Sequence, residues 1–317
     1  MFRRQFVNLI ARNRTNHPYS LRRIDAAKHL FYPSTKEAEA ATADEKKYSK
    51  TLRRLADPIV SFDPSPTGVL FPGLEWFELF APGRGEGRIV NSNKAGETAM
   101  FDADKFLLLT LPSLSQAKGP NPVTFSITHP GDEEDSLYIM NRSYTTIKDA
   151  ADGCTAIYMS LTDDKGTYCF DTACLDSAHR LGWRHLEEWR RVGAWVLPFD
   201  GRAKHVPELG IWLGFTAGRK PHHLCAVDLS SMDPCRAPTL EHATLPGEKS
   251  WDPRLLKLVN MGGNRFCIAK LFDHKDKQFL VLTGVELEPP QDGSSLRMVQ
   301  HKRVRYVFKG QDLNWVL

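Results

Sequence analysis

Residues 193–215, GAWVLPFDGRAKHVPELGIWLGF, decide the fold that we predict for this chain. The runs 195–197 and 211–215 are apolar, and turn residues stand between them, an Asp-Gly pair at 200–201 and the segment 207–210. Glycine adopts a positive φ without steric cost, so both sites suit tight turns. The stretch therefore predicts a strand, a turn, a short strand, a second turn and a further strand.

The same pattern of short apolar runs separated by turn residues continues through most of the chain. Short segments rich in β-branched and aromatic residues, many of them alternating, are separated by Pro and Gly, which is typical of strands in an all-β protein. The clearest segments are VTFSIT (123–128), SLYIM (136–140), TAIYMSLT (155–162), GTYCFDTA (166–173), HLCAVDLS (223–230), LLKLVNM (255–261), RFCIAKLFD (265–273), QFLVLTGVELE (278–288) and VRYVFK (304–309). Near the N-terminus, residues 19–32 predict a strand, a turn and another strand. Residues 183–192 are a further candidate for a helix.

One segment has a different composition. Residues 34–56 are rich in Ala, Glu and Lys, with few large apolar side chains. Ser34 followed by Glu37 matches a capping box, and Asp57-Pro58 supplies a stop. We predict an exposed helical or disordered insertion over residues 34–58 of a single domain that spans residues 1–317.

Acidic residues recur where a predicted strand meets a turn. They are Asp25, Asp102, Asp171, Asp228 and Glu286. A strand, an acidic turn, a variable loop and further strands suit one blade of a propeller, because a four-stranded sheet cannot bury both faces alone and stacking blades covers them. The length fits a β-propeller-like fold of about five to six blades, and chance recurrence of acids at turns is the alternative.

Composition sets the class of protein but not its activity. The 317 residues are 41% hydrophobic and 25% charged, with a net charge of +4, which is ordinary for a soluble globular protein. The charge excess is too small and too dispersed to argue for nucleic acid, and no apolar run is long enough to span a membrane. Six irregularly spaced cysteines favour reduced, buried thiols in a cytoplasmic or nuclear protein. The Arg-rich N-terminus leaves open a mitochondrial or plastid transit peptide.

Several long stretches resemble a plant family expanded in grasses and known only as a domain of unknown function (DUF1668). They are FVNLIARN with YSLRRIDAAKHLFYPS, GRIVNSNKAGETAMFDAD, GTYCFDTA, 193–215 and GGNRFCIAKLF (262–272). The resemblance covers most of the chain and implies a β-propeller-like fold related to kelch and F-box-associated domains, with no catalytic residues to carry over. One departure is the short separation between 136–140 and 155–162, where only 141–154 stands. It implies that one blade is incomplete.

No motif specifies a reaction, so three hypotheses of function remain. The first is a monomeric, non-enzymatic module that binds a protein partner through loops, without cofactor or metal. The second is a propeller enzyme acting on a carbohydrate or ester with channel carboxylates, for which Asp25, Asp102, Asp171 and Asp228 are the candidates. The third is an RNA-associated organelle protein that uses Arg303 and Arg305, although their alternation with Val304, Tyr306 and Phe308 favours a half-buried strand.

Overall fold

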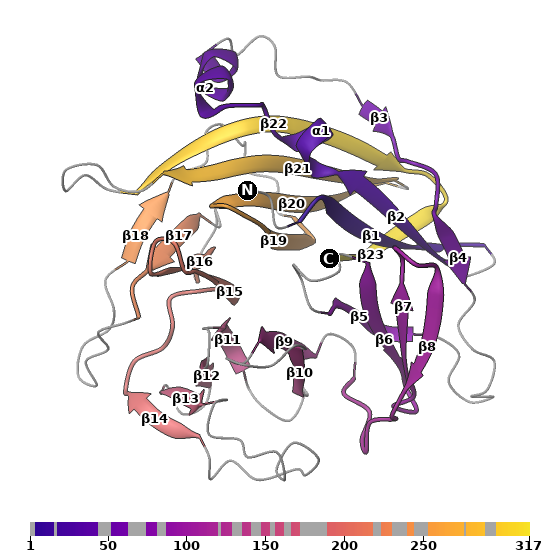
Figure 1. Cartoon of the computed structure of the whole chain (residues 1–317), viewed down its shortest axis with the longest axis horizontal. Helices are drawn as coiled ribbons and strands as arrows, with labels where there is room; N and C mark the ends of the chain where they lie inside the picture. The colour runs from indigo at the N-terminus through magenta and orange to yellow at the C-terminus, as the bar shows by residue number, and fades with distance from the viewer. Residues whose placement is uncertain are drawn as a thin grey trace. The chain divides into compact units, whose positions relative to one another are not determined.

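The fold is described by a computed structural model. It describes residues 4–15, 18–43, 52–62, 74–80, 87–119, 122–128, 135–140, 147–152, 156–161, 166–171, 189–217, 223–229, 240–243, 253–275, 277–288 and 296–317. These residues form five β-sheets and two short helices, so the chain is all-β and β-propeller-like, as the sequence predicts (Figure 1).

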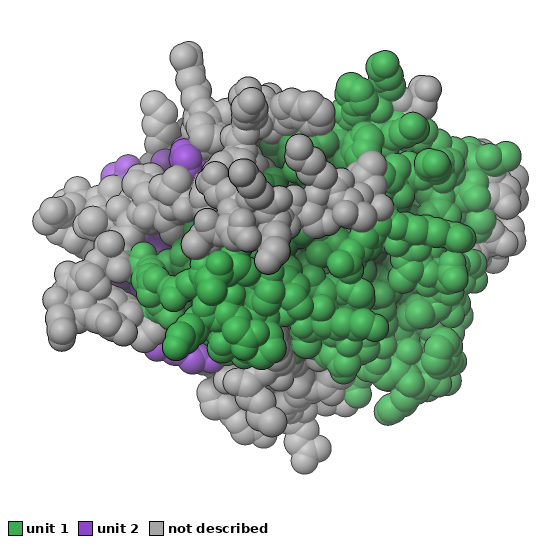
Figure 2. All heavy atoms as spheres, turned by 90° about the horizontal axis from the view of Figure 1, so that it is seen from above, with its two compact units in different colours: residues 1–121, 247–317 green, residues 122–246 purple. Residues whose placement is uncertain are grey.

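The chain divides into two compact units (Figure 2). Unit 1 contains residues 1–121 and 247–317, and unit 2 contains residues 122–246. The single domain over 1–317 stays a prediction, and the two units are therefore described one at a time.

A sheet built from both ends of the chain lies in unit 1 (Figure 1). Its order is β23 (Gln311–Val316), β1 (Phe6–Asn13), β2 (Tyr19–Asp25) and β4 (Val60–Phe62). β1 pairs with β2 and β23 in antiparallel fashion, with Ile10 opposite Leu21 on one side and opposite Trp315 on the other. The last strand of the chain thereby completes the sheet that the first strands begin.

Two further sheets of unit 1 are antiparallel meanders. One consists of β5 (Leu74–Leu79), β6 (Arg88–Asn93), β7 (Thr98–Asp102) and β8 (Leu107–Leu111). The other consists of β19 (Leu255–Gly262), β20 (Arg265–His274), β21 (Lys277–Glu288) and β22 (Arg297–Phe308), to which β3 (Leu52–Arg54) adds in parallel.

Unit 2 contains a two-stranded and an eight-stranded sheet. The small sheet pairs β9 (Val123–Thr128) with β10 (Asp135–Met140). The large one joins two meanders through a parallel contact between the first strand of each. The meanders are β11 (Ile147–Asp152), β12 (Ala156–Leu161), β13 (Thr167–Asp171) and β14 (Arg190–Gly193), then β15 (Gly201–Val206), β16 (Ile211–Phe215), β17 (Leu224–Val227) and β18 (Leu240–Ala243).

The acidic repeat follows the topology of the sheets. Each acid lies on, or directly after, the third strand of a four-stranded meander: Asp25 on β2, Asp102 on β7, Asp171 on β13, Asp228 after β17 and Glu286 on β21. The recurrence therefore marks equivalent positions and is no chance register. The two-stranded sheet β9–β10 lies directly before residues 141–154, the separation from which the sequence analysis inferred an incomplete blade.

Two local predictions near the N-terminus are wrong. The second strand expected within 19–32 is instead helix α1 (Ala26–Leu30), because Asp25 caps it and Ala26 and Leu30 are buried. Helix α2 (Thr35–Ala43) begins at the predicted capping box, where Ser34 Oγ accepts a hydrogen bond from Glu37 N at 3.2 Å. The helical or disordered character expected up to residue 56 fails at 52–54, where β3 pairs with β22.

The prediction of a strand at 195–197 is also wrong. Residues 194–200 form an irregular connection in which Trp195 and Leu197 are buried. At Trp195 and Leu197 its backbone bonds to side chains: Thr167 Oγ1 donates to the Trp195 carbonyl at 2.7 Å, and Leu197 N donates to Ser160 Oγ at 2.8 Å. Among the residues that the structure describes, the connection forms a bridge only at Phe199, with Thr216 beyond the end of β16. Both predicted turns are confirmed, with φ of 83° at Gly201 and 65° at Gly210. The helix candidate 183–192 lies outside the described residues as far as 188, and 190–193 is β14.

Each unit has its own core. In unit 1 the largest cluster of buried side chains joins β1, α1 and β19 to β23, and Figure 1 shows α1 lying against β21 and β22. A second cluster of unit 1 joins β1 and β2 to β5 and β6. In unit 2 the main cluster surrounds Leu197 and Phe199, from the stretch that opens the sequence analysis.

Candidate functional site

Asp25, the first predicted site residue, has a structural task. Its Oδ1 accepts a hydrogen bond from Lys28 N at 3.0 Å and caps α1, while its Oδ2 accepts from Gln5 Nε2 at 3.3 Å. A capping carboxylate satisfies a helix N–H that would otherwise lack a partner. Acid–base chemistry at Asp25 would compete with these two bonds.

Asp102 is buried and organises the hairpin between β7 and β8. Its Oδ1 accepts hydrogen bonds from the backbone N–H groups of Asp104 at 3.0 Å and Lys105 at 3.1 Å. Such a turn is stabilised by an aspartate that replaces a backbone acceptor. The adjacent Asp104 forms an ion pair with Arg23 at 2.6 Å.

The remaining two acids lie in unit 2. Asp171 is the last residue of β13, where it pairs with Ala156, and its side chain lies outside the described residues. Asp228 is exposed and follows β17. A convergence of the four carboxylates stays a prediction, because Asp25 and Asp102 belong to unit 1.

Arg303 and Arg305 lie on β22. Arg305 is exposed and Arg303 is half-buried, whereas Val304, Tyr306 and Phe308 are buried on the opposite face. The alternation expected of a half-buried strand is therefore confirmed. A role of the two arginines in binding RNA stays a prediction.

An exposed apolar strip is the surface feature that the sequence analysis missed. Phe106 is 67% exposed and Leu108 is 65% exposed, and Leu107 and Leu109 are exposed as well. Phe106 also has a positive φ of 54°, which is uncommon for a bulky residue. Large apolar side chains rarely gather on the surface without a role in binding. The signal in the sequence was the unbroken apolar run FLLL, which predicts a strand buried on both faces, so the exposure of these side chains could not be read from it.

The edge position of β8 adds to this strip. β8 pairs with β7 along one side, with Leu111 opposite Thr98 at one end and Leu107 opposite Asp102 at the other. Within the described part of the chain, no strand pairs with the other side of β8. An edge strand presents unpaired N–H and C=O groups that can accept another strand. We call residues 106–109 of this edge the apolar strip.

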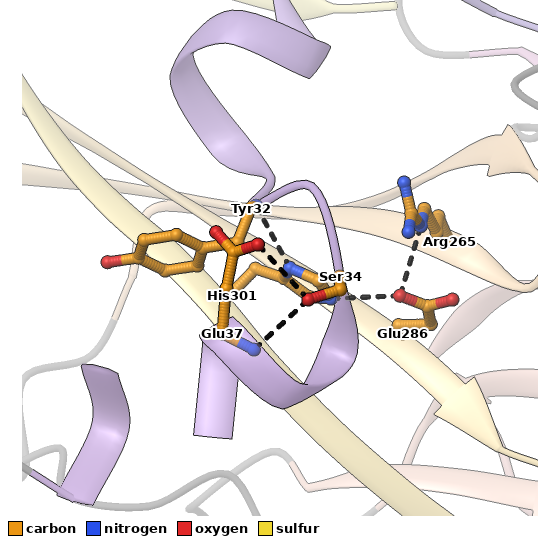
Figure 3. Close-up of polar contacts among 6 residues, drawn as sticks. All are labelled: Tyr32, Ser34, Glu37, Arg265, Glu286 and His301. Atoms are coloured by element: carbon orange, nitrogen blue, oxygen red, sulfur yellow. Dashed lines mark hydrogen bonds and ion pairs between the residues drawn. The ribbon is translucent and has the colours of Figure 1, made fainter. Parts of the chain in front are cut away.

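A partly buried polar network joins the segment between α1 and α2 to the β19–β22 sheet (Figure 3). Glu286 Oε2 lies 3.0 Å from Arg265 Nε and 2.9 Å from His301 Nε2, and His301 Nδ1 accepts from Tyr32 N at 3.1 Å. This pattern makes His301 a neutral imidazole with its proton on Nε2. Both ring nitrogens are occupied, so the network holds the 31–34 segment in place and offers no free base.

Burial lowers the pKa of His301, although the hydrogen bond that its Nε2 donates to Glu286 opposes that effect. The thiols of Cys225 and Cys267 are free and buried, and burial raises the pKa of each to about 12. Among the described residues, no group of three or more His, Cys, Asp or Glu could hold a metal ion. No described helix has the length and apolar character needed to cross a bilayer.

The fold and the surface together define a β-propeller-like protein whose described residues carry an exposed apolar edge. The chain belongs to the family described as Protein of unknown function (DUF1668), whose model matches residues 4–154 and 142–306. Membership of the DUF1668 family, expected from the sequence, is thus confirmed. A comparison with curated proteins gave no match.

Solved structures resemble the chain only distantly. A luciferin-regenerating enzyme is 11% identical, with a TM-score of 0.34, over 98% of this chain and 93% of that one. Apo AztD from Citrobacter koseri is 9% identical, with a TM-score of 0.30, over 96% and 98%. The β-propeller domain of Cps50 (Swd1) from Myceliophteria thermophila is 8% identical, with a TM-score of 0.21, over 68% of each chain. No inference about activity follows from likenesses this weak.

Proposed function

We propose that this protein is a non-enzymatic interaction module that binds an extended apolar segment of a protein partner along β8. The observation that carries the proposal is the exposure of four consecutive large apolar side chains, Phe106 to Leu109, on an edge strand. The partner segment adds a strand to the sheet, so that its backbone bonds to the free edge while its apolar side chains cover the apolar strip.

Charge favours a partner segment with acidic residues beside its apolar run. Lys105 is exposed at the start of the apolar strip, and no acidic residue occurs from 105 to 131. Asp104, the nearest acid, is already paired with Arg23. Complementary charge sets the orientation and speeds the encounter more than it adds affinity.

The other two hypotheses have weaker support. An enzyme with channel carboxylates needs Asp25 and Asp102 to leave the hydrogen bonds that cap α1 and close the β7–β8 turn. Binding of RNA through Arg303 and Arg305 has one exposed guanidinium in its favour, that of Arg305. Salt-dependent RNA binding that is lost in an Arg303→Ala, Arg305→Ala variant would favour that alternative.

Peptide display tests the proposal. A library of random extended peptides is selected against the full chain, and the selected peptides are measured on Leu108→Lys and on the control Ser61→Lys, at an exposed position of β4 outside the proposed binding strand. We expect apolar peptides with acidic flanks whose affinity falls about tenfold or more on Leu108→Lys, since a central apolar anchor carries much of the binding energy. Ser61→Lys should change affinity far less.

Two outcomes contradict the proposal. Peptides that bind wild type and Leu108→Lys equally well would place the binding surface elsewhere. Self-association of the wild type in sedimentation, abolished by Leu108→Lys, would make a second copy the occupant of the apolar strip.

A further inference from the structure

A cleft of about 660 Å³ in unit 1 is lined by far more cationic than acidic side chains. The cations are Arg22, Arg53, Arg54, Lys277 and Lys309, and Asp57 is the one acid among the described residues that line it. Leu55, Phe279, Val307, Phe308 and Gln311 complete the lining. None of these residues belongs to the apolar strip.

The fold gathers these charges from distant parts of the sequence. β3 pairs in parallel with β22, which places Arg53 beside Tyr306 and Arg54 beside Val307. Lys309 directly follows β22, and Lys277 is the first residue of β21. Like charges that are brought together in this way repel one another, so the cleft favours an anion.

Arg22 provides a buried guanidinium in this cleft. It is only 8% exposed, its Nη1 donates to the Ala56 carbonyl, and its Nη2 donates to Gln311 Oε1 at 3.3 Å. Its Nε is buried and has no hydrogen-bond partner in the described part of the chain. Burial lowers the pKa of Arg22, Asp57 opposes this effect and Arg54 adds to it. A buried donor without a partner is costly, and an anion that reaches it would remove that cost.

The single acid balances little of this charge. Arg54 Nη2 and Asp57 Oδ1 lie 3.8 Å apart, and both side chains are about nine-tenths exposed, at 92% and 89%. Exposed pairs of this kind contribute little stability. Four cations of the cleft remain in excess over its one acid.

We propose that this cleft binds a compact anion carrying two or more phosphate groups. Guanidinium groups match phosphate oxygens with paired N–H donors, and lysines add point charges. The cations surround one hollow rather than follow a line along the surface, which suits a small ligand better than a strand of RNA. The phosphates can belong to an inorganic polyphosphate or to a nucleotide, for which half-buried Phe279 offers an aromatic ring.

Titration calorimetry on the full chain tests this site, with sodium tripolyphosphate and ATP as separate probes. The variant Arg54→Ala, Lys277→Ala, Lys309→Ala removes three exposed cations of the cleft. We expect tripolyphosphate to bind about 10- to 100-fold more weakly, because each lost charged contact costs about a factor of a few to ten. The matched control is Lys36→Ala, Lys94→Ala, Arg190→Ala, three exposed cations outside the cleft, and it should change affinity less than about twofold.

A second variant tests the cleft by a gain of affinity. Asp57→Asn removes the one acid of the lining, and we expect tripolyphosphate to bind about threefold more tightly, whereas the exposed control Glu208→Gln should leave binding unchanged. Tighter binding of ATP than of tripolyphosphate assigns the site to nucleotides, and equal binding assigns it to phosphate alone.

Three results overturn the proposal: no binding of either probe, equal weakening by the two triple variants, or binding of a single-stranded RNA oligonucleotide without binding of tripolyphosphate.

Discussion

At the scale of single residues, the distance to neighbouring atoms decides which side chain a position tolerates. Gly284 lies in β21 where the register shifts, and a Cβ added there would collide with the carbonyl oxygen of Leu30 at the end of α1. The missing side chain therefore lets α1 lie against β21. Thr167, fully buried, similarly joins Ser160 at 2.9 Å to the Trp195 carbonyl and supports the irregular connection after β14.

Gly284→Ala should lower the free energy of unfolding by about 1–3 kcal/mol, because a methyl group forced into a packed site displaces backbone. Gly310→Ala is the control, since Gly310 has a φ of 68° and open space around it, so its cost is limited to backbone strain of about 1 kcal/mol. Urea denaturation measures both. Equal costs would show that α1 does not press on β21.

Thr167→Val should also destabilise the protein, by about 1–3 kcal/mol, since it keeps the shape but leaves the Trp195 carbonyl and Ser160 without their shared partner. Thr110→Val, on exposed β8, is the matched change and should stay within about 0.5 kcal/mol. Thermal unfolding that cannot distinguish the two variants would contradict the role of this network.

At the scale of elements, one histidine connects the helical segment to a sheet. Tyr32 N donates to His301 on β22, and His301 in turn contacts Glu286 on β21 (Figure 3). Phe31 packs edge-on against the imidazole at 5.1 Å, Tyr32 stacks on it, and Arg265 and Lys302 are the nearby cations. Protonation would place a second donor against Tyr32 N.

This connection predicts a pH dependence of stability. The folded pKa of His301 lies below its ordinary value of 6.5, so the unfolded chain binds more protons between the two values. Stability should therefore be constant above about pH 7 and fall as the pH drops through 6.5, by at most about 1.4 kcal/mol per pH unit for one group.

Urea denaturation at a series of pH values checks this prediction. His301→Gln should flatten the slope between pH 5 and about 7. His29→Gln should flatten it less, because the pKa of His29 is also lowered but its ring is less buried. A slope unchanged in His301→Gln would refute the assignment.

At the scale of the whole molecule, the two ends of the chain meet in one sheet. β23 lies along β1, and Leu313 and Val316 are buried in the core of unit 1. Arg14 and Asp312 form an ion pair at 2.8 Å next to this contact. The sheet depends on a contact between residues about three hundred positions apart, which local sequence pattern does not encode.

Leu313→Ala should lower the stability of unit 1 by about 2–4 kcal/mol, because it leaves a cavity in a packed core. Hydrogen exchange should speed up in 6–13 and 19–25 while 201–206 in unit 2 keeps its protection. Uniform loss of protection throughout the chain would instead support the single cooperative domain predicted from the sequence.

The sequence by itself determined many of the strands, most turns, the capping box at Ser34 and the repeat of acids on third strands, because side-chain period and turn chemistry act over a few residues. It misplaced 26–30 and 195–197, where burial and distant side chains outweigh local preference. Only the tertiary structure decided that residues 106–109 are exposed, that His301 contacts Glu286, and that Arg53 and Arg54 lie beside β22. Exposure and charge clustering depend on which distant segments become neighbours. The free energy of pairing two strands is spread over their whole length, so no single motif in the sequence reveals which strands pair.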